Sequence, residues 1–207
     1  MSKSSPISKT VSSTLARFRS LRAVSNEAGM AAVEFSLILP ILVVLWVGGV
    51  EVTSALSLDR RLNNLASSMG DLVARTKQIT EAEIQDIFNL AEPALFPHDD
   101  TGIAMRITAV DIDDDGAATV GWTMKQGTLP GHIEDFEDGD LITSLVPEDL
   151  LTPESQIIMA EAYQTYTPAI GYTITGEIDL DDRMFFVPRL VTHVALCEDE
   201  NDDDCDT

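Results

Sequence analysis

Residues 27–58 read EAGMAAVEFSLILPILVVLWVGGVEVTSALSL, and this stretch decides the fold. It is mostly apolar from Phe35 to Val50 and continues with small and apolar residues to Leu58. A helix rises about 1.5 Å per residue and the hydrocarbon core of a bilayer is about 30 Å thick, so about 20 residues suffice to cross it. The sequence therefore predicts a transmembrane helix over residues 30–58.

Glu34 is the residue of this span that a plain membrane anchor does not explain. It lies near the start of the apolar run. A charged carboxylate within a membrane helix costs about 2.5–3.5 kcal/mol on insertion scales, and ionisable residues in such helices usually mark functional sites. We therefore expect Glu34 to have a function.

The charges on the two sides of the span predict its orientation. Residues 1–26 carry five basic side chains: Lys3, Lys9, Arg17, Arg19 and Arg22. The chain becomes strongly acidic after the span. By the positive-inside rule, the N-terminus lies in the cytoplasm and the C-terminal domain in the periplasm, with one pass through the inner membrane.

The segment from Gly29 to Phe35, GMAAVEF, resembles the processing site of a type IV prepilin, where a membrane peptidase cuts after glycine and the fifth mature residue is glutamate. The longer string GMAAVEFSLILP resembles the TadE-like pseudopilins of tight-adherence (Flp) pilus systems. The resemblance implies removal of residues 1–29 as a leader, a mature chain that begins at Met30, and a role for Glu34 in setting the register between subunits. Two later stretches, AEAYQTYTPAI and MFFVPRL, also resemble this family.

The resemblance also implies a function and partners. The chain is expected to be a minor pilin that supports pilus assembly and adhesion. Its partners are then the prepilin peptidase, other minor pilins, the major pilin, the inner-membrane assembly platform and the lipid bilayer. Glu34 is expected to pair with the amine of Met30, in its own chain or in a neighbouring subunit, because burial of an unpaired charge is unfavourable.

Two other kinds of protein fit the same segment. One is a signal-anchored periplasmic binding domain, which binds cations through its many acids. The other is a secreted soluble domain, released by signal peptidase near Thr53-Ser54-Ala55. The mature N-terminus distinguishes these readings from processing after Gly29.

Composition and motifs narrow the function further. The formal charge is −22. A leader of residues 1–29, with five basic residues and Glu27, carries +4, so its loss leaves −26. So negative a charge disfavours nucleic acid as a partner. The histidines, at positions 98, 132 and 193, are far apart in sequence, and no common catalytic or nucleotide-binding motif is present. We expect a protein that is not an enzyme and has no cofactor or metal site.

Cys197 and Cys205 are the two cysteines of the chain, and both fall on the exported side. Because the periplasm is oxidising, we expect a disulfide that closes a small acidic loop. Two free thiols on a frayed tail are the alternative.

The transmembrane helix is predicted to continue to about Arg75. Apolar residues recur along one face at spacings of four and three: Leu58, Leu62, Leu65, Met69 and Leu72. Pro40 removes a backbone donor inside the span, so the helix should kink there. The predicted fold is α+β and pilin-like, with this long N-terminal transmembrane and amphipathic helix packed on a small antiparallel sheet in an exported domain of residues 59–207.

Thr80 and Glu83 form a capping box that predicts a second helix, which Pro93 should end. Alternating residues predict strands over 103–109 and 118–124, joined by a turn at 113–116 that imitates the start of a calcium loop. Trp122 stands where such a loop needs glutamate, so a solvated turn is expected. Residues 126–154 are predicted as a loop docked on the sheet through 141–146 and 150–151. Two further strands are expected over 156–167 and 184–196, with Pro188 at an edge or a bulge.

Overall fold

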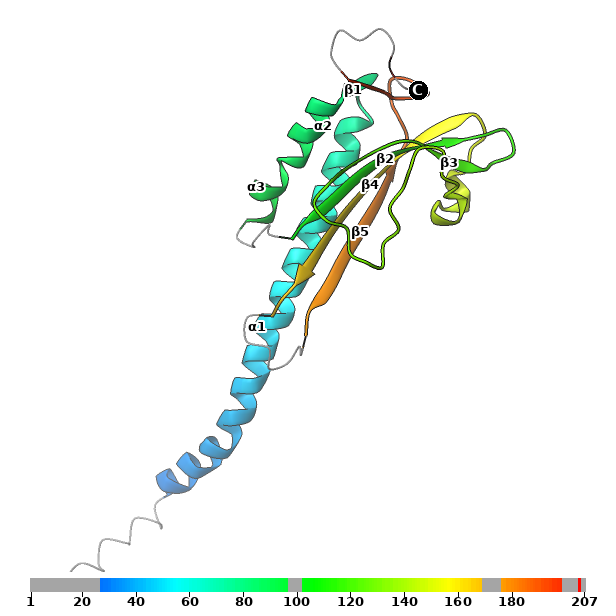
Figure 1. Cartoon of the computed structure of the whole chain (residues 1–207). Coiled ribbons are helices and arrows are strands. Elements are labelled where there is room, and N and C mark those ends of the chain that lie inside the picture. The colour runs from blue at the N-terminus through cyan, green and yellow to red at the C-terminus, as the bar shows by residue number, and fades with distance from the viewer. Residues whose placement is uncertain (1–26, 97–101, 169–175, 199–204, 206–207) are drawn as a thin grey trace, which may run out of the picture. The chain divides into compact units, whose positions relative to one another are not determined.

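The computed structural model describes residues 27–96, 102–168, 176–198 and 205 (Figure 1). Most of the predicted leader, at positions 1–26, and His98 lie outside the described residues. The fold is α+β, with a long N-terminal apolar helix and a small antiparallel sheet, as predicted. The described part of the chain divides into two units between Gly49 and Val50, and the first helix contributes residues to each.

The described elements follow one another in chain order. They are α1 (Glu27–Val73), β1 (Gln78–Thr80), α2 (Glu81–Phe88), α3 (Ala91–Leu95), β2 (Ala104–Ile112), β3 (Ala118–Gln126), the 3₁₀ turns η2 (Thr143–Leu145) and η3 (Glu148–Leu150), β4 (Ser155–Tyr166), β5 (Ile178–Phe186) and β6 (Ala195–Cys197).

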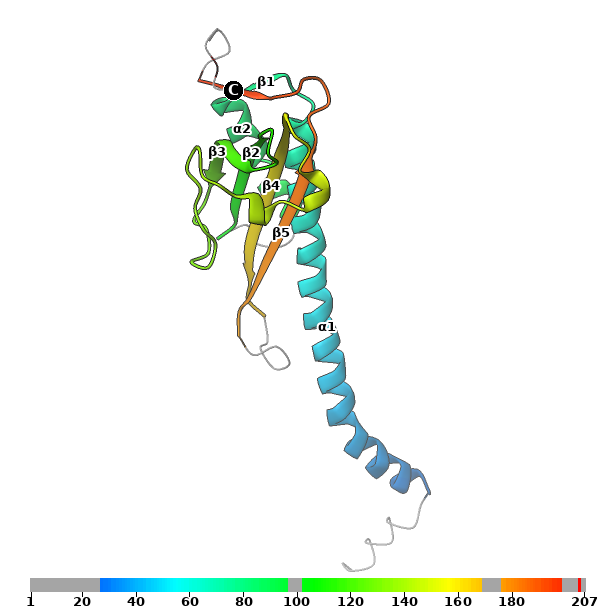
Figure 2. The same cartoon turned by 90° about the vertical axis from the view of Figure 1, so that its right-hand side faces the viewer.

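A four-stranded antiparallel sheet organises the second unit, with its strands in the order β3-β2-β4-β5. Its strands lie across the part of α1 drawn in cyan (Figure 1), and β5 forms one edge of the sheet (Figure 2). Leu62, Leu65 and Met69 of α1 are buried in one core with Ile107 of β2 and Ile158 of β4. The predicted apolar face of the helix is therefore confirmed as far as Met69.

Leu72 was wrongly included in this face. Its side chain is 42% exposed, whereas Val73 is fully buried. At about 100° per residue, Val73 lies about 40° from Met69 around the helix, whereas Leu72 lies about 60° from it on the other side.

The capping box at the start of α2 is confirmed. Thr80 Oγ1 accepts a hydrogen bond from the backbone N–H of Glu83 (3.2 Å), and a Glu83 side-chain oxygen accepts one from the Thr80 N–H (2.9 Å). The prediction that Pro93 ends this helix is wrong, because α2 ends at Phe88 and Pro93 lies in α3. Proline is tolerated in the first turn of a helix, where its missing N–H would have no partner.

The strands β2 and β3 form the predicted hairpin. Asp113 Oδ1 accepts hydrogen bonds from the backbone N–H groups of Asp115 and Ala117, and Gly116 has a φ of 81°. These are the contacts of a tight turn. The simple alternation predicted for β2 is wrong, however, since Arg106 and Thr108 are as buried as their apolar neighbours.

The second face of β2 is buried because the segment after β3 folds back over it. Phe136, Ile142 and Val146 form a second core with Val110 and Ile157, as expected for a docked loop. Leu141 is an exception to that expectation, because its side chain is 70% exposed while its backbone bridges to Thr119.

The predicted last strand, 184–196, is wrong in its bounds. The strand β5 begins earlier, at Ile178, and ends at Phe186, two residues before Pro188. The chain then crosses to the helix, where the Arg189 N–H donates to the carbonyl of Ala74 (2.8 Å). It ends in β6, which pairs in parallel with β1 and not with the large sheet, so His193 lies outside any strand.

Candidate functional site

The first part of α1 presents an exposed apolar surface. The large apolar side chains from Val33 to Trp46 are exposed, as are Met30 at 66% and Phe35 at 58%. Within the described residues, α1 is the one helix long and apolar enough to cross a membrane. A core helix of a soluble protein would bury such residues, so this surface favours a single membrane anchor.

Three predicted site residues lie together on this segment. Gly29 and Met30 lie in the first turn of α1, and Glu34 follows one turn later with an exposed side chain. Ser36 Oγ donates a hydrogen bond to the Val33 carbonyl (2.8 Å). The carboxylate of Glu34 thus stands on an otherwise apolar surface, available to a group that approaches from outside the chain.

Pro40 lies inside α1, which continues through it. Its ring removes the backbone donor that would bond to the carbonyl of Ser36, one turn earlier. The bend at Pro40 stays a prediction, based on this missing hydrogen bond.

Glu51 is a buried acid that sequence reasoning missed. It stands at the end of the apolar run, in the second unit, and is 2% exposed. The Tyr166 hydroxyl donates a hydrogen bond to its backbone carbonyl (3.3 Å). The signal that could have found it is its position as a single acid between Val50 and Val52.

A second missed feature is a group of buried charges on the sheet. Glu161 Oε2 accepts a hydrogen bond from Arg106 Nε (2.6 Å), and Glu161 Oε1 accepts from Arg183 Nε and from the Tyr163 hydroxyl (both 2.7 Å). The guanidinium of Arg106 also stacks over Phe136 at 3.7 Å and donates to the Glu134 carbonyl (2.7 Å). These contacts fasten the loop after β3 to the sheet.

Burial and the neighbouring charges shift the pKa values of Glu161 and Tyr163. Burial alone would raise the pKa of Glu161, but the hydrogen bond and charge of Arg106, with the charge of Arg183, hold it below its ordinary value. Burial and the negative charge of Glu161 raise the pKa of Tyr163. Glu161 is therefore ionised and Tyr163 protonated at neutral pH, which is the state in which every partner is satisfied.

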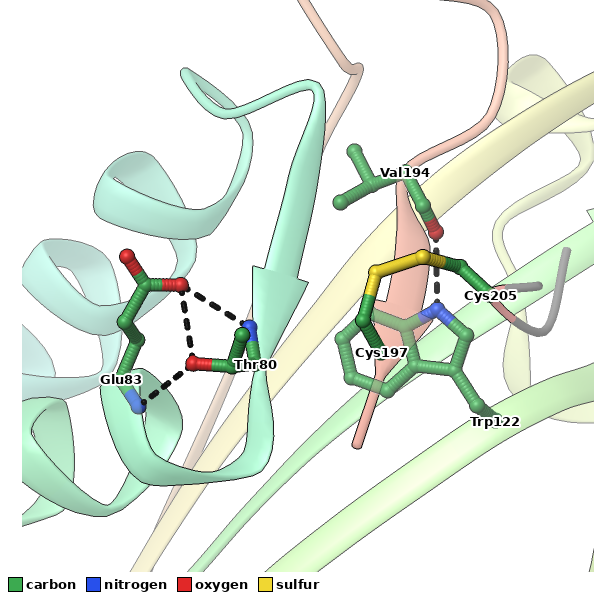
Figure 3. Close-up of a disulfide and its surroundings, with 6 residues drawn as sticks. All are labelled: Thr80, Glu83, Trp122, Val194, Cys197 and Cys205. Atoms are coloured by element: carbon green, nitrogen blue, oxygen red, sulfur yellow. Dashed lines mark hydrogen bonds between the residues drawn. A yellow bond between two sulfur atoms is a disulfide. The ribbon is translucent and has the colours of Figure 1, made fainter. Parts of the chain in front are cut away.

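The structure joins Cys197 and Cys205 in a disulfide, with Cα atoms 4.4 Å apart. Figure 3 shows it together with Trp122, whose Nε1–H donates to the Val194 carbonyl (2.9 Å). The Val194 N–H in turn donates to Gln156 Oε1 (2.7 Å). The C-terminal segment is thus tied to the sheet by side chains from two strands.

The described residues contain no group of three or more histidine, cysteine, aspartate or glutamate side chains placed to hold a metal ion. The site residues predicted from sequence fall into two sets. Gly29, Met30, Glu34 and Pro40 share one helical segment, and Cys197 and Cys205 come together in the second unit.

The comparison with family models matches residues 29–70 to the TadE-like protein family. Searches of the curated proteins and of the solved structures found no match. The matched segment begins at the predicted processing glycine and ends within α1, at the glycine that faces the sheet. Over residues 29–70, the chain therefore matches the family that its sequence resembles.

Proposed function

We propose that this chain is a minor pilin, or pseudopilin, needed for assembly of a tight-adherence pilus that supports adhesion. The observation that carries the proposal is the exposed carboxylate of Glu34 on the exposed apolar part of α1, within a TadE-like segment. An apolar helix with a single acid near its start is suited to membrane insertion followed by packing against other helices of the same kind.

In this proposal the leader holds the precursor in the inner membrane, with the N-terminus in the cytoplasm and the second unit in the periplasm. A prepilin peptidase removes the leader after Gly29, so that Met30 carries the new amine. The basic leader, the apolar helix and the acidic remainder of the chain support this orientation.

Glu34 then sets the position of each subunit relative to its neighbours. In the membrane an unpaired carboxylate is costly, and a positive N-terminal amine of a neighbouring subunit offsets that cost when the two helices align at one stagger. The partners are other minor pilins and the major pilin, at the inner-membrane assembly platform. The ion pair contributes register more than stability.

Two substitutions at one position test this role. Glu34→Gln keeps the size and removes the charge, and Glu34→Leu removes the polarity as well. We expect both variants to be processed and held in the membrane, but to lose surface pili and crosslinks to neighbouring subunits. Asp59→Asn, which neutralises an exposed acid beyond the span on the same helix, serves as the matched control and should leave piliation unchanged.

The measurements are electron microscopy of surface pili, crosslinking in membranes, and intact mass of the mature chain. Wild-type piliation in both Glu34 variants would reject the assembly role. A mature chain that begins near Ser57 would indicate a secreted domain, and an intact chain in the membrane would indicate a signal-anchored periplasmic domain.

A further inference from the structure

Arg60 and Arg61 differ from the other described arginines. Those others each form an ion pair with a carboxylate: Arg75, Arg106, Arg183 and Arg189. Within the described part of the chain, neither Arg60 nor Arg61 has a carboxylate at ion-pairing distance, although the sequence contains 35 acidic residues. In so acidic a chain, two adjacent arginines without acidic partners are available to an anion from outside.

Both arginines line an open groove of about 530 Å³ on α1. The rest of its lining follows the helical repeat and is mostly polar: Thr53, Leu56, Ser57 and Asn64. Arg61 Nη1 donates to the Ala94 carbonyl of α3 (3.3 Å), whereas its Nε–H is buried and has no hydrogen-bond partner among the described residues. Two guanidinium groups beside a hydroxyl and an amide are donors of the kind that phosphate oxygens prefer.

With the apolar run placed in the hydrocarbon core, as in the proposed function, the groove would lie at the height of lipid head groups. The apolar run ends near Val50, and the groove begins three residues later at Thr53, about 5 Å further along the helix axis. The head-group layer extends about 5–8 Å beyond the hydrocarbon core. Arginine side chains on a helix point back towards its N-terminus and extend their charged ends to the membrane interface, which brings the guanidinium of Arg60 down towards Ser57 and that layer.

We propose that this groove binds the phosphate of an anionic phospholipid in the membrane leaflet that adjoins residues 50–64. The bound lipid fixes the depth of α1 in the bilayer and the rotation of α1 about its own axis. The remaining surface of the mature chain is strongly acidic and is repelled by anionic lipids, so this groove is a local exception to that repulsion. The proposal rests on the membrane anchoring in the proposed function, and it does not depend on pilus assembly.

The test uses the full-length chain in nanodiscs of phosphatidylcholine and phosphatidylglycerol, one copy per disc. Native mass spectrometry measures how much of each lipid stays bound on release. We expect phosphatidylglycerol to be retained in preference to phosphatidylcholine, and Arg60→Gln to reduce this preference about fivefold. Arg75→Gln makes the same charge change 15 residues further along the chain, just beyond the end of α1, and should leave the preference unchanged.

Arg60 is exposed, so Arg60→Gln should fold, which circular dichroism checks. Arg61→Gln removes the second arginine of the same groove and should also reduce the preference for phosphatidylglycerol. An unchanged preference in both variants, or an equal loss in Arg75→Gln, would overturn the proposal. The alternative is that the groove is a contact between two copies of the chain. Disulfide crosslinking of Ser57→Cys in larger discs tests this. Crosslinks that Arg60→Gln abolishes, together with unselective lipid retention, would overturn the lipid site.

This test separates the groove from the proposed function. Insertion into discs without selectivity for phosphatidylglycerol overturns the lipid site alone. Failure to insert overturns the anchoring as well. Loss of pili with normal lipid retention bears on assembly and leaves the lipid site standing.

Discussion

At the scale of single residues, Glu161 is a buried carboxylate that pairs with two arginines. Its carboxylate accepts from Arg106, Arg183 and Tyr163, and its side chain is 1% exposed. The side chain of Arg106 is equally buried, whereas that of Arg183 is 31% exposed. Arg106 therefore depends on Glu161 for its counter-charge far more than Arg183 does.

Glu161→Gln should destabilise the chain by about 3–5 kcal/mol, because the charge of Arg106 is then buried without a carboxylate. The substitution should also remove a pH dependence. The pKa of Glu161 is lower in the folded chain than its ordinary value of 4.5, so the stability that it contributes is present above that pH and is lost on acidification through the folded pKa. Urea unfolding of the detergent-solubilised chain at several pH values measures both effects.

Asp135→Asn provides the control for this prediction. Asp135 also pairs with a cation, Lys125, but both side chains are about half exposed. Its loss should change stability by less than about 1 kcal/mol. If Glu161→Gln were as mild as this control, the buried pair would contribute little to stability.

The sequence did not reveal the pairing of Arg106 with Glu161, and the reason is local. Each charge stands in an alternating strand at a position that faces solvent in a two-layer fold. Both charges are buried here because Phe136 and the segment around it cover that face of the sheet. A cover contributed by a distant part of the chain cannot be read from the alternation within a strand. By contrast, roles for Gly29 and Glu34 could be predicted from the sequence, because the motif that suggests them lies within a few neighbouring residues. The disulfide could be predicted because the chain contains two cysteines, and the structure confirms it.

At the scale of elements, the contact between α1 and the sheet depends on Gly70. A Cβ atom at this position would lie 2.3 Å from Phe186 Cδ2 and 3.1 Å from the Cβ of Ala160. Glycine is the residue that lets the helix approach β4 and β5 so closely.

Gly70→Ala should destabilise the chain by about 1–3 kcal/mol, because the ring of Phe186 must move from its packed position. This direction opposes helix propensity, which favours alanine over glycine by about 1 kcal/mol. Phe186→Leu, combined with Gly70→Ala, should recover part of the loss. Thermal unfolding followed by circular dichroism measures the series.

Gly49→Ala is the matched control in the same helix. No atom lies within 4 Å of a Cβ at that position, so alanine should be neutral or stabilising. A similar loss in both glycine variants would show that the close approach to Phe186 is not the cause.

The elements with strong local signals were predicted well from the sequence, and the edge of the sheet was not. The capping box and the β2–β3 hairpin depend on turn chemistry within a few residues. The strand β5 is an edge strand in which Asp182 interrupts the apolar alternation of Ile178, Leu180, Met184 and Phe186, so its first half gives only a weak signal in the sequence. The apolar residues of 191–196 were predicted as part of this strand. They instead pack on the core and lead into β6, which pairs with β1.

At the scale of the whole molecule, the disulfide reports on which side of the membrane the second unit lies. In the proposed orientation Cys197 and Cys205 reach an oxidising compartment. We expect the exported chain to be lighter than its reduced form by the mass of two hydrogens and to resist alkylation. The same chain without residues 27–49 should stay in the cytoplasm with both thiols open to alkylation. Labelled thiols in the exported chain would contradict the orientation.

The C-terminal crossing also has a consequence for how the chain acquires its fold during synthesis. The guanidinium of Arg189 donates a hydrogen bond to Asp71, 118 residues earlier in sequence. The indole N–H of Trp122 donates to the carbonyl of Val194, 72 residues later. In the proposed orientation, neither contact can form until the last part of the chain has left the ribosome and crossed the bilayer. Contacts of such long range slow folding, so the end of α1 and the indole of Trp122 would stay incompletely covered during that transfer. A periplasmic chaperone that recognises exposed apolar surface would then have its longest opportunity to bind this chain before residue 194 emerges.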